Sequence, residues 1–140
     1  MIKEVSITID SIQTVDGESD KTELFTVGTM ESCENGYRLH YDESEATGFE
    51  GSKVTVTVTD DSVVVERTGK AISTLIIERG KKHHCHYGTE FGEFLIGVNT
   101  DEVRNDLEES GGEVYLKYTL DINSSLMSEN EMKIKVKEKK

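Results

Sequence analysis

The stretch Val54-Thr-Val-Thr-Val-Thr59 alternates an apolar residue with a polar one at every step. Successive side chains of a β-strand point to opposite faces, so this pattern predicts a strand with its valines buried and its threonines toward solvent. The same period of two recurs across the chain, for example over residues 5–9 near its start and 132–136 near its end. The sequence therefore predicts an all-β protein.

Short turn signals separate the predicted strands. Asn35-Gly36 is the strongest of them, because a type I′ turn requires positive φ at both central residues and these two residue types adopt it readily. Asp16-Gly17, Asp60-Asp61 and Thr68-Gly69 are further turn signals. Strands joined by connections this short pair antiparallel.

One segment, residues 101–108, is predicted to be a short helix. Thr100 is a suitable N-terminal cap, and acidic residues follow it in the first turn. Val103 and Leu107 are four residues apart, the spacing that brings two side chains together on a helix. Gly111 and its neighbour would end this helix.

About eight to ten strands in 140 residues must bury one face, and an open sheet of that width curls or splits. An antiparallel up-and-down β-barrel closes the sheet and removes its edges. A jelly roll or sandwich is the alternative, but it needs longer crossover connections than this chain offers. Without proline or a Gly/Ser-rich linker, residues 1–140 are predicted to form a single domain.

The composition narrows the classes of partner. The net charge of −12 opposes binding to phosphate backbones, so no nucleic-acid partner is expected. No apolar run approaches the ~18–20 residues that a membrane-spanning helix needs, and no signal peptide is recognisable, so we expect no membrane partner and a cytoplasmic location. Cys33 and Cys85 are then expected to be free thiols. Lysines at the chain end are predicted to form the solvent face of a last strand.

A set of ordered positions runs along nearly the whole chain and matches a known pattern. These positions are Arg67, Gly69, Gly80, Tyr87, Thr89, Phe91, Gly92, Thr100, Leu107, Gly112 and Tyr118. With this spacing the chain resembles the YwiB-like bacterial proteins, a domain of unknown function. The resemblance implies a meander barrel similar to the calycins, that is, to the lipocalin-like and fatty-acid-binding-protein-like barrels. It implies no established activity, and the chain has no tryptophan for the Gly-x-Trp mark of true lipocalins.

The histidine-rich run from His83 to His86 is the strongest candidate for a metal site. His84 and His86 share one face of a strand, and with Glu90 they fit most of the first cupin motif, which supplies three metal ligands. The second cupin motif is missing, since the chain has no proline and no later histidine. The fourth ligand is therefore absent unless His40 supplies it from another strand. We favour a solvated outer wall, and predict no metal, no cofactor and no catalytic residue.

Arg67 is in phase with the valines of its strand and is predicted to project toward the apolar face. A buried charge needs a partner. Arg67 therefore either anchors an anionic ligand in the lumen or closes one end of the barrel by binding backbone carbonyls or an acid across the sheet. Tyr41, Tyr87 and Tyr118, with Thr89, are predicted to be core, rim or lumen-lining residues.

Three function classes follow from these observations. The first is a non-catalytic, lipocalin-like barrel that binds a small apolar or anionic ligand through Arg67, Tyr87, Thr89, Tyr118 and Tyr41. The second is a structural or protein-interaction barrel with a filled core. In either case the chain is expected to be a monomer or a homodimer. The third is a cupin-like, metal-dependent enzyme using His84, His86 and Glu90. A barrel of this size holds one small molecule or none, so the size of the lumen separates the first two classes.

Overall fold

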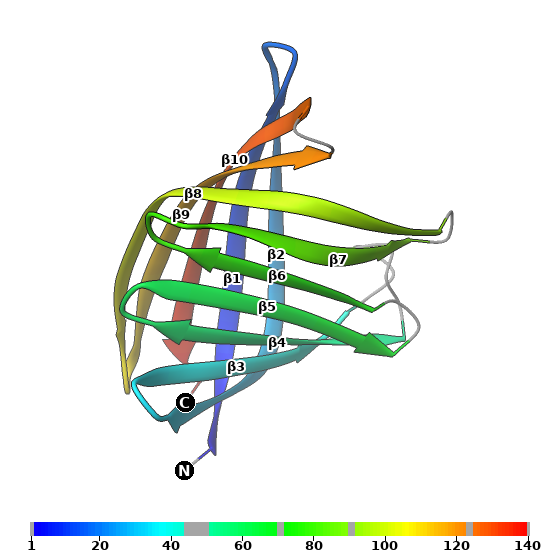
Figure 1. Cartoon of the computed structure of the whole chain (residues 1–140). Helices are drawn as coiled ribbons and strands as arrows, with labels where there is room; N and C mark the ends of the chain where they lie inside the picture. Colours follow the sequence, from blue (N-terminus) through cyan, green and yellow to red (C-terminus); the bar gives the residue numbers. More distant parts are fainter. Residues whose placement is uncertain (1, 44–50, 70–71, 90–91, 123–124, 140) are drawn as a thin grey trace.

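The computed structural model describes residues 2–43, 51–69, 72–89, 92–122 and 125–139, apart from the side chains of 86–89, 92–94 and 126. Ten antiparallel strands make up this part of the chain (Figure 1). They are β1 (Ile2–Val15), β2 (Glu18–Cys33), β3 (Gly36–Asp42), β4 (Ser52–Thr59), β5 (Ser62–Gly69), β6 (Ser73–Glu78), β7 (Lys82–Thr89), β8 (Gly92–Glu108), β9 (Gly111–Ile122) and β10 (Ser125–Glu138).

Each strand pairs with the next in the chain, and β1 also pairs with β10, which closes the barrel. The predicted antiparallel up-and-down barrel of eight to ten strands is therefore confirmed. The ladders differ greatly in length. The β1–β2 ladder runs from Ile2–Glu31 to Val15–Glu18, whereas β6 and β7 share the single register pair Ser73–Tyr87.

The predicted helix over residues 101–108 is wrong, because these residues continue strand β8. Val103 and Leu107 are both buried, as the helix argument required. Residues four apart also share a face of a strand, so this spacing fits both structures. The partner strand decides between them, since β8 pairs with β9 as far as Glu108–Gly111. Thr100 lies within β8 and does not cap a helix. None of the described segments is a helix long and apolar enough to cross a membrane.

A β-bulge in β8 changes which residues face the core. The register with β9 shifts between Thr100 and Glu102, so Asp101 is an extra residue. Even-numbered residues such as Val98 are buried before the bulge, and odd-numbered ones such as Val103 are buried after it. Bulges bend a strand as well as shifting its phase. In Figure 1, β8 and β9 curve from the group of β3–β7 toward the long strands β1, β2 and β10, which run across that group.

The β2–β3 hairpin forms one residue earlier than predicted. Cys33 pairs with Gly36, so the central residues are Glu34 and Asn35, and of these only Asn35 has positive φ, at 66°. The turn is therefore not type I′. Gly36 is needed for a different reason, because a Cβ atom there would lie 1.8 Å from the carbonyl oxygen of Val58 on β4. The β1–β2 turn at Asp16 and Gly17 does have positive φ at both residues, 51° and 80°.

Apolar side chains fill the middle of the barrel. The valines of β4 are buried, with Val54, Val56 and Val58 at most 2% exposed, as their alternation with threonine predicted. On β10 the apolar residues also face inward and Lys135 is exposed, as expected for the last strand. The largest fully buried side chains come from strands around the whole barrel and are Ile7, Met30, Leu39, Ile77, Leu116 and Ile134. Burial of this kind is the main stabilising contribution to the fold.

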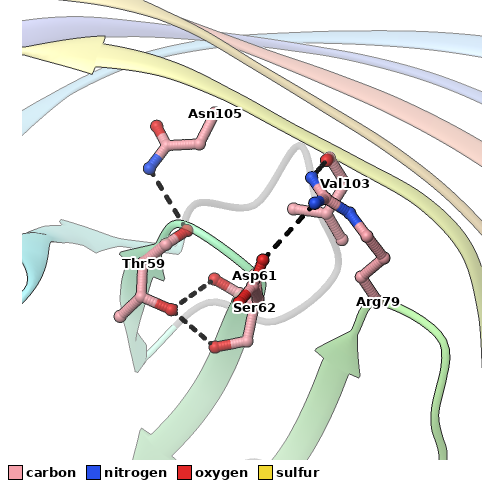
Figure 2. Close-up of polar contacts among 6 residues, drawn as sticks. All are labelled: Thr59, Asp61, Ser62, Arg79, Val103 and Asn105. Atoms are coloured by element: carbon pink, nitrogen blue, oxygen red, sulfur yellow. Dashed lines mark hydrogen bonds and ion pairs between the residues drawn. The ribbon is translucent and has the colours of Figure 1, made fainter.

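At one end of the barrel, hydrogen bonds and an ion pair connect the β4–β5 turn, the end of β6 and strand β8 (Figure 2). The Nδ2 atom of Asn105, on β8, donates to the carbonyl oxygen of Thr59 at 3.2 Å, where β4 turns into β5. The Arg79 guanidinium, after β6, donates to the Val103 carbonyl and to Oδ1 of Asp61, the latter at 3.4 Å. These contacts join two hairpin ends to a strand more than 20 residues away in sequence. This end of the barrel is therefore fixed by hydrogen bonds.

We predict that Asn105→Ala lowers the free energy of unfolding by about 1–3 kcal/mol, because it removes the donor to Thr59 and the acceptor of the Leu107 amide, which lies 2.9 Å from Asn105 Oδ1. Urea denaturation followed by circular dichroism measures this. The control is Asp106→Ala, at the exposed neighbouring position, which should change stability by less than about 0.5 kcal/mol. Equal effects of the two substitutions would contradict the role given to Asn105.

Candidate functional site

Arg67 forms a buried ion pair with Glu43. Its Nε and Nη2 atoms donate to Glu43 Oε1 at 3.2 and 3.0 Å, and its Nη1 atom donates to Ser73 Oγ at 3.2 Å. The Arg67 side chain is 16% exposed and that of Glu43 only 2%. β5 places Arg67 directly opposite Ser73 of β6, and the Glu43 amide is held by the carbonyl oxygen of Ser52 at 2.9 Å. The sheet therefore positions both members of the pair.

This ion pair favours the structural alternative for Arg67 over the ligand anchor. The structural hypothesis required an acid or backbone carbonyls as partner, and Glu43, just after β3, is such an acid. A guanidinium already neutralised by a buried carboxylate attracts an anionic ligand weakly. From sequence alone, residues 43–51 are predicted to form a solvated acidic loop, which gives Glu43 no role; the structure buries it instead. Its position, two residues beyond inward-facing Tyr41, was the signal that would have found it.

Tyr41 lies beside the ion pair, and its pKa is raised. Burial, followed by the negative charge of Glu43, raises the pKa of Tyr41 to about 12, while the positive charge of Arg67 acts in the opposite direction. The second carboxylate oxygen of Glu43, Oε2, is buried and has no hydrogen-bond partner among the described residues. Tyr41, Glu43, Arg67 and Ser73 thus form a polar cluster at the edge of an otherwise apolar core.

Removal of the arginine should be costly because it would leave Glu43 as an unpaired buried charge. We predict that Arg67→Ala lowers the free energy of unfolding by about 3–5 kcal/mol at neutral pH. The control is Arg104→Ala. The Arg104 side chain is 64% exposed and pairs with Glu102, so its loss should cost less than about 1 kcal/mol. Urea denaturation measures the free energy of unfolding of both variants. Similar losses for the two would show that the buried ion pair contributes no more to stability than an exposed one.

The tyrosine gives a pH-dependent prediction. A tyrosine in the unfolded chain has a pKa of about 10, and in the folded protein that of Tyr41 is about 12. The unfolded state therefore loses this proton first, so its contribution to stability is intact below pH 10 and is lost as the pH rises toward 12. Absorbance at 295 nm, recorded after rapid pH jumps, should show one tyrosine ionising at a higher pH than the others. Tyr41→Phe should remove this high-pH ionisation, and the control Tyr37→Phe should retain it. If the high-pH ionisation persists in Tyr41→Phe, it belongs to another tyrosine and the prediction is wrong.

The histidine-rich strand β7 presents different residues to its two faces. Cys85 is buried at 3% exposure and faces inward, whereas His84 is exposed. The side chains of His86, Tyr87 and Thr89, and all of Glu90, lie outside the described part of the structure. The predicted ligand roles of Tyr87 and Thr89 therefore remain predictions.

His40 and His83 have hydrogen-bond partners other than a metal. The two ring nitrogens of His40, suggested as an additional ligand, lie 3.1 Å from Thr55 Oγ1 and 3.1 Å from Glu31 Oε1, and His83 Nε2 lies 2.9 Å from Glu78 Oε1. Among the side chains that the structure describes, no group of three or more His, Cys, Asp or Glu residues is arranged to hold a metal ion.

The hydrogen bond from His40 lowers the pKa of Glu31, as expected for a carboxylate that accepts from a positively polarised donor.

Cys85 is a structural thiol. The backbone N–H of Ile76, on β6, donates to its Sγ atom at 3.4 Å. Burial raises the pKa of Cys85, which keeps it as the unreactive thiol at neutral pH. The contact also satisfies a backbone donor where β6 and β7 share little of a ladder.

A pocket of about 370 Å³ opens at the mouth of the barrel, and the residues of the Arg67 cluster are not in its described lining. Its described lining is partly apolar, with Leu75, Ile96 and Leu120 from three different strands, and partly polar, with carboxylate, amide and hydroxyl groups. The residues that line it are Ser11, Ile12, Gln13, Asp20, Thr22, Leu75, Ile96, Tyr118, Leu120, Met127, Asn130, Glu131 and Met132. No lysine or arginine is among them.

The sequence-predicted residues divide between two places. Tyr118 lines the mouth pocket, whereas Tyr41 and Arg67 belong to the buried cluster and are not part of the pocket lining described. The other lining residues are not among those predicted from the sequence. Leu75, Ile96 and Leu120 continue the inward-facing pattern of their strands, so an apolar inward residue near the end of the filled core was the available signal.

Comparison with known proteins supports the fold. Residues 7–134 match a family model described as Domain of unknown function (DUF1934). The chain is 25% identical over 118 residues to the uncharacterized beta-barrel protein YwiB of Bacillus subtilis (strain 168), covering 84% of this chain and 82% of that protein. The crystal structure of ywiB protein from Bacillus subtilis superposes with a TM-score of 0.88 at 22% identity, covering 99% of this chain and 94% of the other.

Proposed function

Because this chain belongs to the family described as Domain of unknown function (DUF1934), which carries no activity in its description, its function has to be argued from its own geometry. We propose that it is a non-catalytic barrel that binds a small, neutral or cationic, largely apolar molecule in the pocket at its mouth. The predicted likeness to ligand-binding calycins belongs to the same proposal.

The mouth pocket is the observation that carries this proposal. Its volume of about 370 Å³ falls in the range of roughly 300–1,000 Å³ that small-molecule sites occupy. Leu75, Ile96 and Leu120 provide an apolar surface, and Gln13 and Asn130 provide amide groups that could orient a ligand. An apolar surface with a few convergent polar groups is typical of a site that selects one small molecule.

The charge of the site determines which ligands fit. Asp20 and Glu131 are the charged side chains described in the lining, and both are acidic. The whole chain carries a net charge of −12, which adds to the repulsion of anions. Arg67, which suggested an anionic ligand, is paired with Glu43 and does not line the pocket. The proposal therefore retains the apolar ligand of the sequence analysis and replaces the anionic one with a neutral or cationic one.

The filled core supports the competing class, a structural barrel, and restricts where a ligand could bind. Ile7, Met30 and Leu116 occupy the middle of the barrel and are at most 2% exposed. A ligand is therefore confined to the mouth and is smaller than those held in a hollow barrel. The non-catalytic part of the proposal is supported by Cys85, a buried thiol whose raised pKa makes it a poor nucleophile.

Dye binding tests the proposal. We predict that the neutral dye Nile red binds saturably with one site per chain, and that the anionic dye 8-anilinonaphthalene-1-sulfonate binds at least about tenfold more weakly because of the acidic lining. Leu120→Trp should fill the pocket and weaken Nile red binding by about tenfold or more, a loss of about 1.4 kcal/mol. Fluorescence titration measures all three affinities.

The matched control is Leu95→Trp, which adds the same indole at an exposed position that does not line the pocket. This variant should bind Nile red as the unsubstituted protein does. Absence of saturable Nile red binding, or equal loss in the two variants, would reject the mouth pocket as the site and favour the structural barrel.

A further inference from the structure

Strand β2 has a long edge that is not covered by any strand described. It pairs with β1 over most of its length, from Glu18 to Glu31, but with β3 only from Thr29 to Cys33. Residues 18–27 therefore pair with one strand only within the part of the chain that the structure describes. Figure 1 shows the end of the β1–β2 hairpin projecting beyond the other strands. A projecting strand edge presents backbone N–H and C=O groups ready to pair with another strand.

The outer face of this edge carries an apolar pair beside a charged pair. Phe25 is 65% exposed and Val27 is 44% exposed, which is unusual for side chains of this size on a strand. Lys21 and Glu23 precede them on the same face, because all four positions are odd-numbered. The usual protection of a strand edge by proline is absent, since the chain contains none.

From this edge we infer that a second copy of the chain docks against β2, antiparallel and edge to edge, to form a homodimer with one continuous sheet. In a two-fold symmetric antiparallel pair, residues opposite each other lie on the same face, so the symmetry axis passes through one residue position. With the axis at Thr22, Lys21 lies opposite Glu23 of the partner subunit. Symmetry repeats this contact, so the dimer has two cross-strand ion pairs.

Charge selects this register over its neighbours. With the axis at Lys21, two lysines would face each other, and with the axis at Glu23, two glutamates would do so. Like charges directly opposite each other destabilise a strand pair, whereas opposite charges stabilise it. Register is otherwise weakly specified along a strand edge. The alternation of Lys21, Thr22 and Glu23 is thus self-complementary only about Thr22.

The net charge of −12 on each copy opposes association at long range. At physiological ionic strength the screening length is about 8 Å, so charges spread over two barrels repel each other weakly, while contacts across a strand pair persist. Asp20 and Thr22 also line the mouth pocket, so the second copy would lie beside that pocket. The dimer does not depend on the pocket holding a ligand.

Charge reversal with sedimentation velocity tests the inferred dimer at physiological salt. Lys21→Glu places four acidic residues across the interface and Glu23→Lys places four basic ones, so each variant should dimerise at least about tenfold more weakly than the unsubstituted chain. An equimolar mixture of the two variants pairs Glu with Lys at both contacts. The mixture, and the double variant Lys21→Glu/Glu23→Lys, should therefore regain dimer formation.

The control is Lys135→Glu, the same charge change on β10, a strand already paired on both sides. It should leave the dissociation constant within about twofold, and circular dichroism should show that every variant is folded. The inference is overturned if the unsubstituted chain sediments as a monomer up to its solubility limit. It is equally overturned if the mixture dimerises no better than the single variants, or if Lys135→Glu weakens the dimer as much as Lys21→Glu does.

Discussion

The ladder between β1 and β10 is the contact on which the whole barrel depends. Every other ladder joins strands that are consecutive in the chain, whereas this one pairs residues 5–14 with residues 129–138. Without it, the remaining ladders would leave a ten-strand open sheet with its apolar face in water. Closing a loop of more than 100 residues has an entropic cost that grows slowly with length, so the two apolar rows that meet there, including Ile7 and Ile134, must offset it by burial.

Closure by one long-range ladder also explains where polar groups are tolerated. The middle of the barrel is filled by aliphatic side chains, so functional groups can only occupy its ends and its mouth. One end is occupied by the Asn105 and Arg79 contacts, and the Arg67–Glu43 pair occupies another edge of the core. A buried carboxylate such as Glu43 is tolerated because Arg67 pairs with it, while the hydroxyl of Ser73 accepts a further N–H of the same guanidinium and holds it in place.

The sequence predicted the strand content and the closed meander well because both follow from local signals. Alternation along Val54–Thr59 depends only on which face is buried, and hairpin connections depend only on short turns. It predicted residues 101–108 wrongly, because the spacing of Val103 and Leu107 fits both a helix and a strand, and only the pairing with β9 separates them. For Arg67 the sequence predicted the kind of partner, an acid or backbone carbonyls, but not that the acid is Glu43. The pairing register of the strands brings these two residues together, and the sequence pattern does not specify that register. The mouth pocket depends on the packing of six strands, which no local pattern encodes.

Because of the bulge at Asp101, the number of residues in β8 determines which of its side chains face the core. Residues before it face the core at even positions and residues after it at odd ones, and both halves pair with the continuous strand β9. Loss of one residue from this strand without loss of the bulge would turn Val103 and Leu107 outward and bring their charged neighbours into the core. Loss of the bulge residue itself would keep the phase, because Thr100 and Val103 would then be two positions apart, but it would remove the bend that carries the strand around the barrel. Apart from the loss of the bulge residue, insertions and deletions in β8 therefore keep the same side chains facing the core only in even numbers, or where a second bulge restores the phase.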